Sequence, residues 1–189
     1  MTGWIALALL LVVLVYFIVL YNHLVNIKHG VNKAWANIDV LLKQRHDELP
    51  KLLETCRQYM KFEQDTLERV MQARAQVSAA RESHDIAALG NAEGALRLGL
   101  GNLFAVAENY PDLKTNDTFK HLQGRITSLE NAIADRREFY NESVNVNNVR
   151  IEQFPDVIVA RLLGFQPFTL LKFSSTEKVD VNIRHLFNV

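Results

Sequence analysis

An uncharged apolar run from Trp4 to Tyr21 constrains this chain more than any other part of its sequence. As an α-helix the run would measure roughly 27 Å, at about 1.5 Å per residue. The hydrocarbon core of a bilayer is about 30 Å thick, and a helix satisfies its own backbone polar groups where water is absent. The sequence therefore predicts one transmembrane helix over residues 4–21, with the lipid bilayer as a partner. We expect the membrane anchor to include Trp4, Leu10, Val15 and Tyr21.

Two other interpretations of this run fit less well. A cleaved signal peptide needs a basic start and a small-residue cleavage site. Residues 1–3 carry no basic side chain, and no A-x-A pattern follows the run. A buried core helix would normally be shorter and would show a polar face. We therefore expect an uncleaved anchor.

The charges on either side of the run predict its orientation. Three uncharged residues precede it, whereas Lys28 and Lys33 follow it. Cytoplasmic flanks hold the excess of Lys and Arg in membrane proteins. We therefore expect residues 1–3 outside the cell, residues 22–155 as a cytoplasmic helical bundle, and residues 156–189 as an apolar C-terminal tail.

Composition excludes several classes of function. The 21 Lys and Arg residues balance 21 Asp and Glu residues, so no basic field exists to gather nucleic acid, and we expect none as a partner. The basic cluster at residues 43–46 is interpreted as a solvated helix face. A single cysteine, Cys56, excludes a disulfide within one chain.

Apolar residues recur three or four positions apart immediately after the anchor, as on one face of a helix. This stripe needs a partner surface, and anchored helices share one orientation in the membrane plane. We therefore expect a homo-oligomer, with a self-association face formed by Val31, Trp35, Ile38 and Leu42.

Pro50 leaves two alternatives open for the course of this helix. Proline in a helix interior removes a hydrogen bond and clashes with the preceding turn, but it is favoured at the first helical position. The apolar stripe continues through Pro50 in phase, which favours one long kinked helix. A hairpin around residues 46–50 is the other alternative.

The rest of the chain predicts further long helices and an all-α fold. A second helical stretch covers residues 51–81, with Cys56 on its apolar stripe as a small buried hydrophobe. Asp85 can cap a third helix that ends near Tyr110, and residues 109–112 are predicted to form a turn. Thr115 or Asn116 caps a fourth helix that reaches about residue 153. Asparagines are frequent on this fourth helix and are expected to be exposed by default. Interhelical hydrogen bonds or a register-setting buried position are the alternatives for Asn131, Asn141, Asn145, Asn147 and Asn148.

The tail from Val157 to Phe173 is unusually apolar for a chain terminus. If the helices alternate up and down from the anchor, this tail begins at the level of the membrane. It would then meet the bilayer surface, its own bundle or a neighbouring subunit. The candidate contact residues are Ile158, Arg161, Leu162, Phe165 and Phe168.

Nothing in the sequence reaches a catalytic signature. Asp117 and His121 are four residues apart on a predicted helix, but a metal site needs three or four converging ligands. No G-x-S-x-G motif and no phosphate-binding glycine loop is present. We therefore expect no catalytic residues, no metal and no cofactor, and a protein that is not an enzyme.

Four longer strings carry a family resemblance: YNHLV, AWANIDVLLKQRHDELPKLLETC, AENYPDLKTNDTF and EFYNESVNVNNVRIEQFP. Together they resemble the LemA family of bacterial membrane proteins. The resemblance implies a short external N-terminus, one transmembrane helix and a cytoplasmic up-and-down four-helix bundle, in a family whose molecular function is not established. It also favours a turn at Pro50 over the continuous helix. The string ESVNVNN and the long tail depart from the usual family pattern.

Together these features predict a single-pass protein of the bacterial inner membrane. Its fold is expected to be one N-terminal transmembrane helix running into an antiparallel, up-and-down bundle of long helices. The predicted function is a membrane-anchored scaffold that self-associates at the cytoplasmic face. The alternative is an adaptor that recruits a membrane protease or another partner enzyme.

Overall fold

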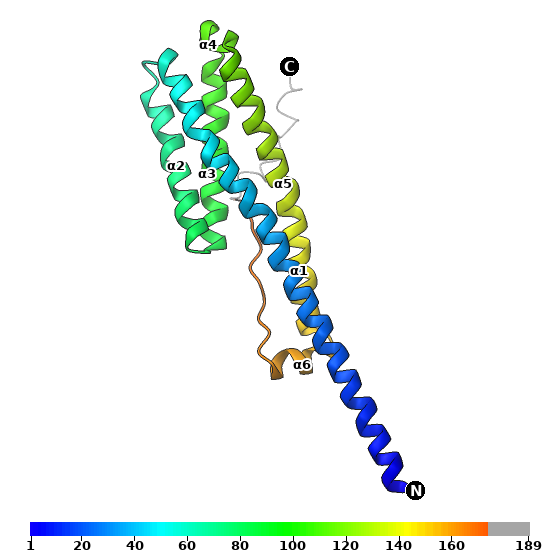
Figure 1. The fold of residues 1–189 in the computed structure, drawn as a ribbon. Coiled ribbons are helices and arrows are strands. Elements are labelled where there is room, and N and C mark those ends of the chain that lie inside the picture. The colour runs from blue at the N-terminus through cyan, green and yellow to red at the C-terminus, as the bar shows by residue number, and fades with distance from the viewer. Residues whose placement is uncertain (174–189) are drawn as a thin grey trace, which may run out of the picture. The chain divides into compact units, whose positions relative to one another are not determined.

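The computed structural model describes residues 1–173, which form helices and connecting loops with no strand in that range (Figure 1). This confirms the all-α fold, in which a long apolar N-terminal helix is followed by further helices packed in a bundle. The helices are α1 (Thr2–Tyr59), α2 (Gln64–Glu82), α3 (Ile86–Ala107), α4 (Pro111–Thr115), α5 (Asp117–Glu152) and α6 (Asp156–Leu162).

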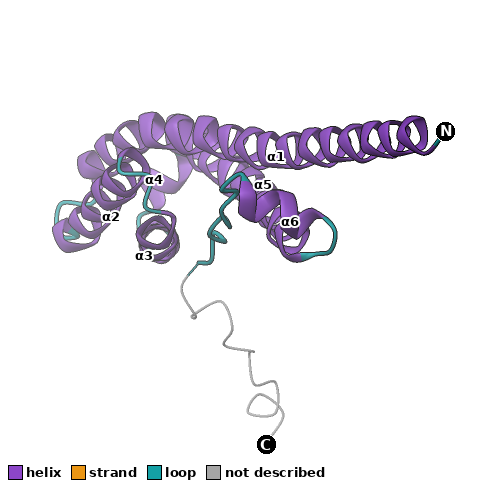
Figure 2. Ribbon diagram, turned by 90° about the horizontal axis from the view of Figure 1, so that it is seen from below, coloured by secondary structure: helices purple, strands orange, loops and turns teal. Residues whose placement is uncertain are grey.

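The described residues form two compact units, and both α1 and α5 contribute to each of them. The first unit contains residues 1–38 and 135–170. Within it, α1 and α5 lie side by side and α6 lies beside them (Figure 2). One buried cluster joins these three helices through Leu24, Ile151, Val159 and Ala160.

The start of α1 lies outside any packed core. Its side chains before Phe17 are exposed, because no other part of the first unit covers them. Within residues 1–173, α1 is the helix that is long and apolar enough to cross a membrane, and none of its apolar window is buried. An apolar surface of this length that packs against no protein is the surface a bilayer would cover.

Of the described residues, the second unit contains 39–134 and 171–173. It holds the end of α1, all of α2, α3 and α4, and the start of α5. The apolar stripes predicted from helical spacing are buried in this core. Representative members are Leu52, Val70, Val77, Leu89, Leu96, Leu103, Leu122, Ile126 and Ile133.

Two helix starts are capped as the sequence predicted. The Asp85 side chain accepts a hydrogen bond from the Ala88 backbone N–H at 2.9 Å, at the start of α3. The Asn116 side chain accepts one from the Phe119 backbone N–H at 2.9 Å, at the start of α5. Each cap satisfies a backbone donor that has no partner within its own helix.

The expected turn at Pro50 is wrong, because α1 continues through Pro50 to Tyr59. A second helical stretch starting at residue 51 is wrong for the same reason, since the turn lies at residues 60–63 and α2 begins at Gln64. The in-phase apolar stripe was therefore the better guide. Residues 111–115, partly predicted as a turn, form the short helix α4.

A tertiary contact explains how the helix accommodates Pro50. Proline has no N–H to donate to the carbonyl four residues earlier, which belongs to His46. Arg74 of α2 supplies the missing donor, because its Nε lies 3.1 Å from the His46 carbonyl oxygen. The Arg74 guanidinium also contacts His46 Nε2 at 2.7 Å. A side chain from the neighbouring helix thus replaces the backbone hydrogen bond that Pro50 removes.

This contact predicts that the effects of substitutions at positions 50 and 74 depend on one another. Arg74→Met should cost about 1–3 kcal/mol of unfolding free energy, because it leaves the His46 carbonyl unsatisfied. In a Pro50→Ala background the cost should be smaller, because the backbone N–H that alanine restores at position 50 can bond that carbonyl. Urea unfolding of the wild type, the two single variants and the double variant measures the coupling free energy between the two positions. Arg69→Met, at an exposed position of α2, serves as the control, and equal costs in both backgrounds would contradict the prediction.

Candidate functional site

The most distinctive surface of the first unit lies where the apolar run of α1 ends. There α6 turns Val159 and Ala160 towards the core. Phe17 and Leu20, from the last turn of the apolar run, pack against the same cluster. The position of α6 along α1 is therefore fixed by side chains that belong to the predicted anchor.

After α6 the chain turns at residues 163–164 and continues as a return segment, residues 165–170, which is bonded to α5. The Asn148 side chain accepts a hydrogen bond from the Phe168 backbone N–H and donates one to the Phe168 carbonyl, each at 2.9 Å. The Tyr140 hydroxyl donates to the Thr169 carbonyl at 3.0 Å. The Asn148 amide thus satisfies both backbone groups of Phe168, as a neighbouring strand would.

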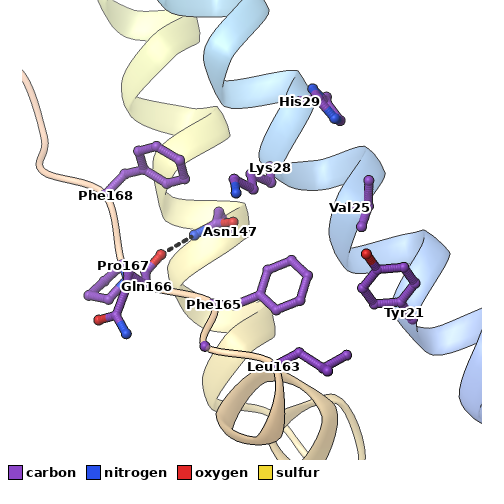
Figure 3. A pocket seen from close by; sticks show the side chains of 11 residues that line it. Tyr21, Val25, Lys28, His29, Asn147, Leu163, Phe165, Gln166, Pro167 and Phe168 are labelled. Atoms are coloured by element: carbon purple, nitrogen blue, oxygen red, sulfur yellow. Dashed lines mark hydrogen bonds between the residues drawn. The ribbon is translucent and has the colours of Figure 1, made fainter.

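A pocket of about 460 Å³ opens between α1 and the return segment (Figure 3). Phe165 and Tyr21 meet edge to face at its lower end, with ring centroids 6.2 Å apart. Lys28 and Asn147 face each other across it, from α1 and α5. The pocket therefore combines aromatic walls with one cationic side chain, seven residues past the end of the apolar run.

Charged side chains tie α6 to the two long helices. Asp156, which is 2% exposed, accepts a hydrogen bond from Arg150 at 3.5 Å. The same guanidinium lies 3.2 Å from His23 Nε2 on α1. Asp156, the one acidic residue of α6, therefore points inward. The exposed side of α6 carries no negative charge.

A buried ion cluster lies in the second unit and joins α1, α3 and α5. Arg45 and Glu93 are each 1% exposed and form an ion pair, and Arg45 also bonds Glu130 at 2.6 Å. Burial alone would lower the pKa of Arg45, but the two carboxylates outweigh it and raise that pKa. Because the Arg45 guanidinium bridges Glu93 and Glu130 with one bond to each, it favours the arrangement in which these faces of the three helices meet.

The interpretation of residues 43–46 as a solvated face is wrong for Arg45. Its place in phase with Leu42 and Leu49 on the apolar stripe was the available signal for burial. That signal could not identify Glu93 or Glu130, because they come from distant parts of the sequence.

The structure also locates the groups considered for catalysis. Cys56 is buried as predicted, and burial raises the pKa of its thiol from 9.0 to about 12. A thiol of this kind is a poor nucleophile at neutral pH. Asp117 and His121 are exposed, and among residues 1–173 no group of three or more His, Cys, Asp or Glu side chains could hold a metal ion.

The predicted anchor residues all lie on exposed surface of α1. The exposed fractions are 79% for Trp4, 61% for Leu10, 57% for Val15 and 41% for Tyr21. Tyr21 is the least exposed because it meets Phe165. The lipid contact of these residues stays a prediction.

The face predicted for self-association has partners within the chain itself. Val31, Ile38 and Leu42 are at most 1% exposed, and Trp35 packs edge to face on Tyr140 at 5.8 Å. Val31, Ile38 and Leu42 therefore offer no open surface to a second copy, whereas Trp35 is only half-buried. Self-association stays a prediction that needs another surface.

The five candidate contact residues of the tail divide into two groups. Ile158, Arg161 and Leu162 are exposed on α6, with Ile158 at 57% and Leu162 at 70%. Phe165 and Phe168 are half-buried in the return segment, where they line the pocket. Sequence reasoning missed the role of Asn148, since exposure was the expectation for the asparagines of this helix.

Comparison with known proteins identifies the family. The LemA family model matches residues 34–185, which is most of the chain. The chain belongs to the LemA family. Protein LemA of Metamycoplasma hominis is 26% identical over 168 residues, covering 88% of this chain and 75% of that protein.

Two further relatives of this LemA-family chain are magnetosome proteins. Magnetosome protein MamQ 2 of Paramagnetospirillum magneticum is 38% identical over 79 residues, and magnetosome protein MamQ of Magnetospirillum gryphiswaldense is 37% identical over 79 residues. Each match covers 42% of this chain but only 29% of the relative. Together with the apolar span, these relatives indicate a membrane-associated helical protein.

The bonding of the return segment predicts a specific effect of Asn148→Asp. This change removes the donor to the Phe168 carbonyl and places a carboxylate against it, so the return segment should detach from α5. Hydrogen exchange should show faster exchange of the Phe168 amide, with α3 in the second unit unchanged. Asn145→Asp, at an exposed position of the same helix, is the control, and equal exchange in both variants would refute the assignment.

The ion cluster predicts a large, pH-dependent effect of Arg45→Met. Removing one partner of a buried pair costs about 3–5 kcal/mol, because it takes away the guanidinium charge that compensates the buried carboxylate of Glu93. Protonating the glutamate removes the carboxylate charge, so the loss of unfolding free energy should shrink as the pH falls. Chemical unfolding at several pH values measures this, with Lys43→Met as an exposed control. A loss that stays constant with pH would count against the lost charge compensation as the cause.

Proposed function

We propose that this LemA-family chain is a membrane-anchored helical scaffold. In this proposal α1 crosses the bacterial inner membrane with its N-terminus outside, and the packed helices lie at the cytoplasmic face. The protein acts by binding other surfaces and not by catalysis. Its copies associate side by side through an exposed stripe on α5.

The observation that carries the proposal is the direct passage from apolar run to packed core. Leu20 of the run packs against the buried cluster that contains Leu24, so no flexible linker separates the run from the core. The helix that would cross the bilayer is thus itself part of the folded unit. A protein built this way holds its adjoining helices at a set height and angle, as a scaffold requires.

The surface for self-association is the side of α5 that carries Phe139, Val146 and Val149. These residues are 52%, 47% and 42% exposed and are spaced by seven and then three positions. Residues at that spacing lie along one side of a helix and form an apolar seam, which is the pattern by which two helices pair. Membrane anchoring favours such pairing, because all copies share one plane and one orientation.

A binding role agrees with the chemistry of the described residues. The buried ion cluster is enclosed among three helices, and the one cysteine is buried with a raised thiol pKa. The most polar buried groups therefore hold helices together and do not face a substrate.

The test is the mass of the full-length protein in native lipid, measured on membranes that were first washed with carbonate. The wild type should resist the wash and appear as an oligomer. Val146→Glu should give monomers, because it places a charge in the apolar seam. Val40→Glu changes an equally exposed valine outside that seam and should leave the oligomer intact.

Three results would contradict the proposal in different ways. Release of the protein by carbonate would show that α1 does not anchor it in the membrane. A wild type that is only monomeric would refute self-association. Recovery of a defined second protein after cross-linking, in place of further copies, would favour the adaptor that recruits a protease or another enzyme.

A further inference from the structure

We propose that α6, with its flanking residues Phe154 and Leu163, is a membrane-interface element. In this proposal its outer side lies in the lipid headgroup region, beside the point where α1 leaves the bilayer. The inference goes beyond the scaffold function and rests on it only for the anchoring of α1.

The first argument is that α6 is apolar on two opposite sides. Val159 and Ala160 are 1% and 2% exposed and face the core. Ile158 and Leu162, four residues apart on the other side, are 57% and 70% exposed. The side that a water-facing helix would make polar therefore carries large aliphatic groups.

The flanking residues extend this outer surface. Phe154, just before α6, is 81% exposed, and Leu163, just after it, is 47% exposed. Four large apolar side chains are thus open within ten residues. Large exposed apolar side chains gathered in so short a segment mark a contact with another protein or with a membrane.

The second argument is the position of α6 along α1. Its core cluster includes Phe17 and Leu20, which lie in the last turn of the predicted span. Tyr21 meets Phe165 just beyond α6, and Lys28 follows about 10 Å further along the helix at 1.5 Å per residue. A tyrosine at the end of the span and a lysine about 10 Å beyond it are the order expected across a headgroup layer. The apolar outer side of α6 therefore adjoins the surface of α1 that lipid would cover.

The third argument is charge. Asp156 is the only acidic residue of α6, and it is buried against Arg150. Arg161 is the charged residue on the exposed side. A short helix with an apolar outer side and only positive exposed charge matches a bilayer that contains anionic lipid.

These arguments favour the bilayer over a second copy of the chain as the occupant. The bilayer already contacts α1 next to this patch, so α6 needs no further partner to bury its outer side. Helices of this kind bury their apolar face roughly 5–10 Å into the headgroup and acyl boundary. The geometry thus predicts shallow insertion at position 162 and deep insertion at position 10.

The test places a fluorescent label at single cysteines in the full-length protein, with Cys56→Ala removing the native thiol. The labelled variants are Leu162→Cys on α6, Leu10→Cys in the span and Glu138→Cys on exposed α5. Because Leu162 is 70% exposed, the label does not disturb the core. Each protein is reconstituted in phosphatidylcholine and phosphatidylglycerol vesicles that carry a nitroxide at either the headgroup or the acyl-chain end.

The headgroup nitroxide should quench the label at 162, and the acyl-chain nitroxide should quench the label at 10. A water-soluble quencher alone should reach the label at 138. If the label at 162 behaves like the label at 138 while position 10 is quenched, the interface proposal is overturned and the anchor stands. If position 10 is not quenched either, the anchor itself is refuted.

One further result would assign the outer side of α6 to protein. In that case neither nitroxide nor the aqueous quencher would reach the label at position 162, and unlabelled Leu162→Cys protein would form disulfide cross-links between two copies. A second chain would then cover α6. That result would overturn the proposal in favour of a subunit contact.

Discussion

The first unit depends on one constraint, which is that a single unbroken helix, α1, carries both an exposed apolar run and part of a packed core. Its first turns expose apolar side chains in every direction, as a helix in lipid requires. From Leu24 onward the same helix is amphipathic and packs against α5 and α6. The change occurs within one turn and without a break in the helix, so the end of the apolar run determines where the core can begin.

Polar contacts then decide which faces of the apolar helices meet. Hydrophobic burial alone is non-directional, and stripes of leucine and valine tolerate several pairings. Arg45 between two glutamates, Arg74 at the His46 carbonyl and Asn148 at Phe168 each accept only one arrangement. Removing one partner of such a contact is costly, and this cost makes other pairings of the helix faces unfavourable.

Sequence patterns predicted the local features of this structure well. The apolar run, the caps at Asp85 and Asn116, and the buried stripes depend on spacing within a few residues, which the sequence displays directly. The turn expected at Pro50 was wrong because the donor that compensates for it, Arg74, lies 24 positions away. Arg45 was misinterpreted for the same reason, since its carboxylate partners are distant in sequence.

The candidate site was predictable only in part. The apolar tail and its residues Ile158 and Leu162 stood out from composition, whereas the folding of that tail into α6 and a return segment did not. The hydrogen bonds of Asn148 to a backbone 20 residues later have no periodic signature. The likeness to LemA proteins specified the class of fold and left these contacts undetermined.

The sharing of Phe17 and Leu20 between the apolar run and the buried cluster has a practical consequence. A water-soluble fragment made by deleting the whole run, as is customary for single-pass proteins, would also remove the side chains that cover Leu24 and Val159. Such a truncated protein would lack part of its core and would expose apolar side chains at its new N-terminus. The apolar run and the stretch that the protein needs for its own integrity overlap by about one helical turn.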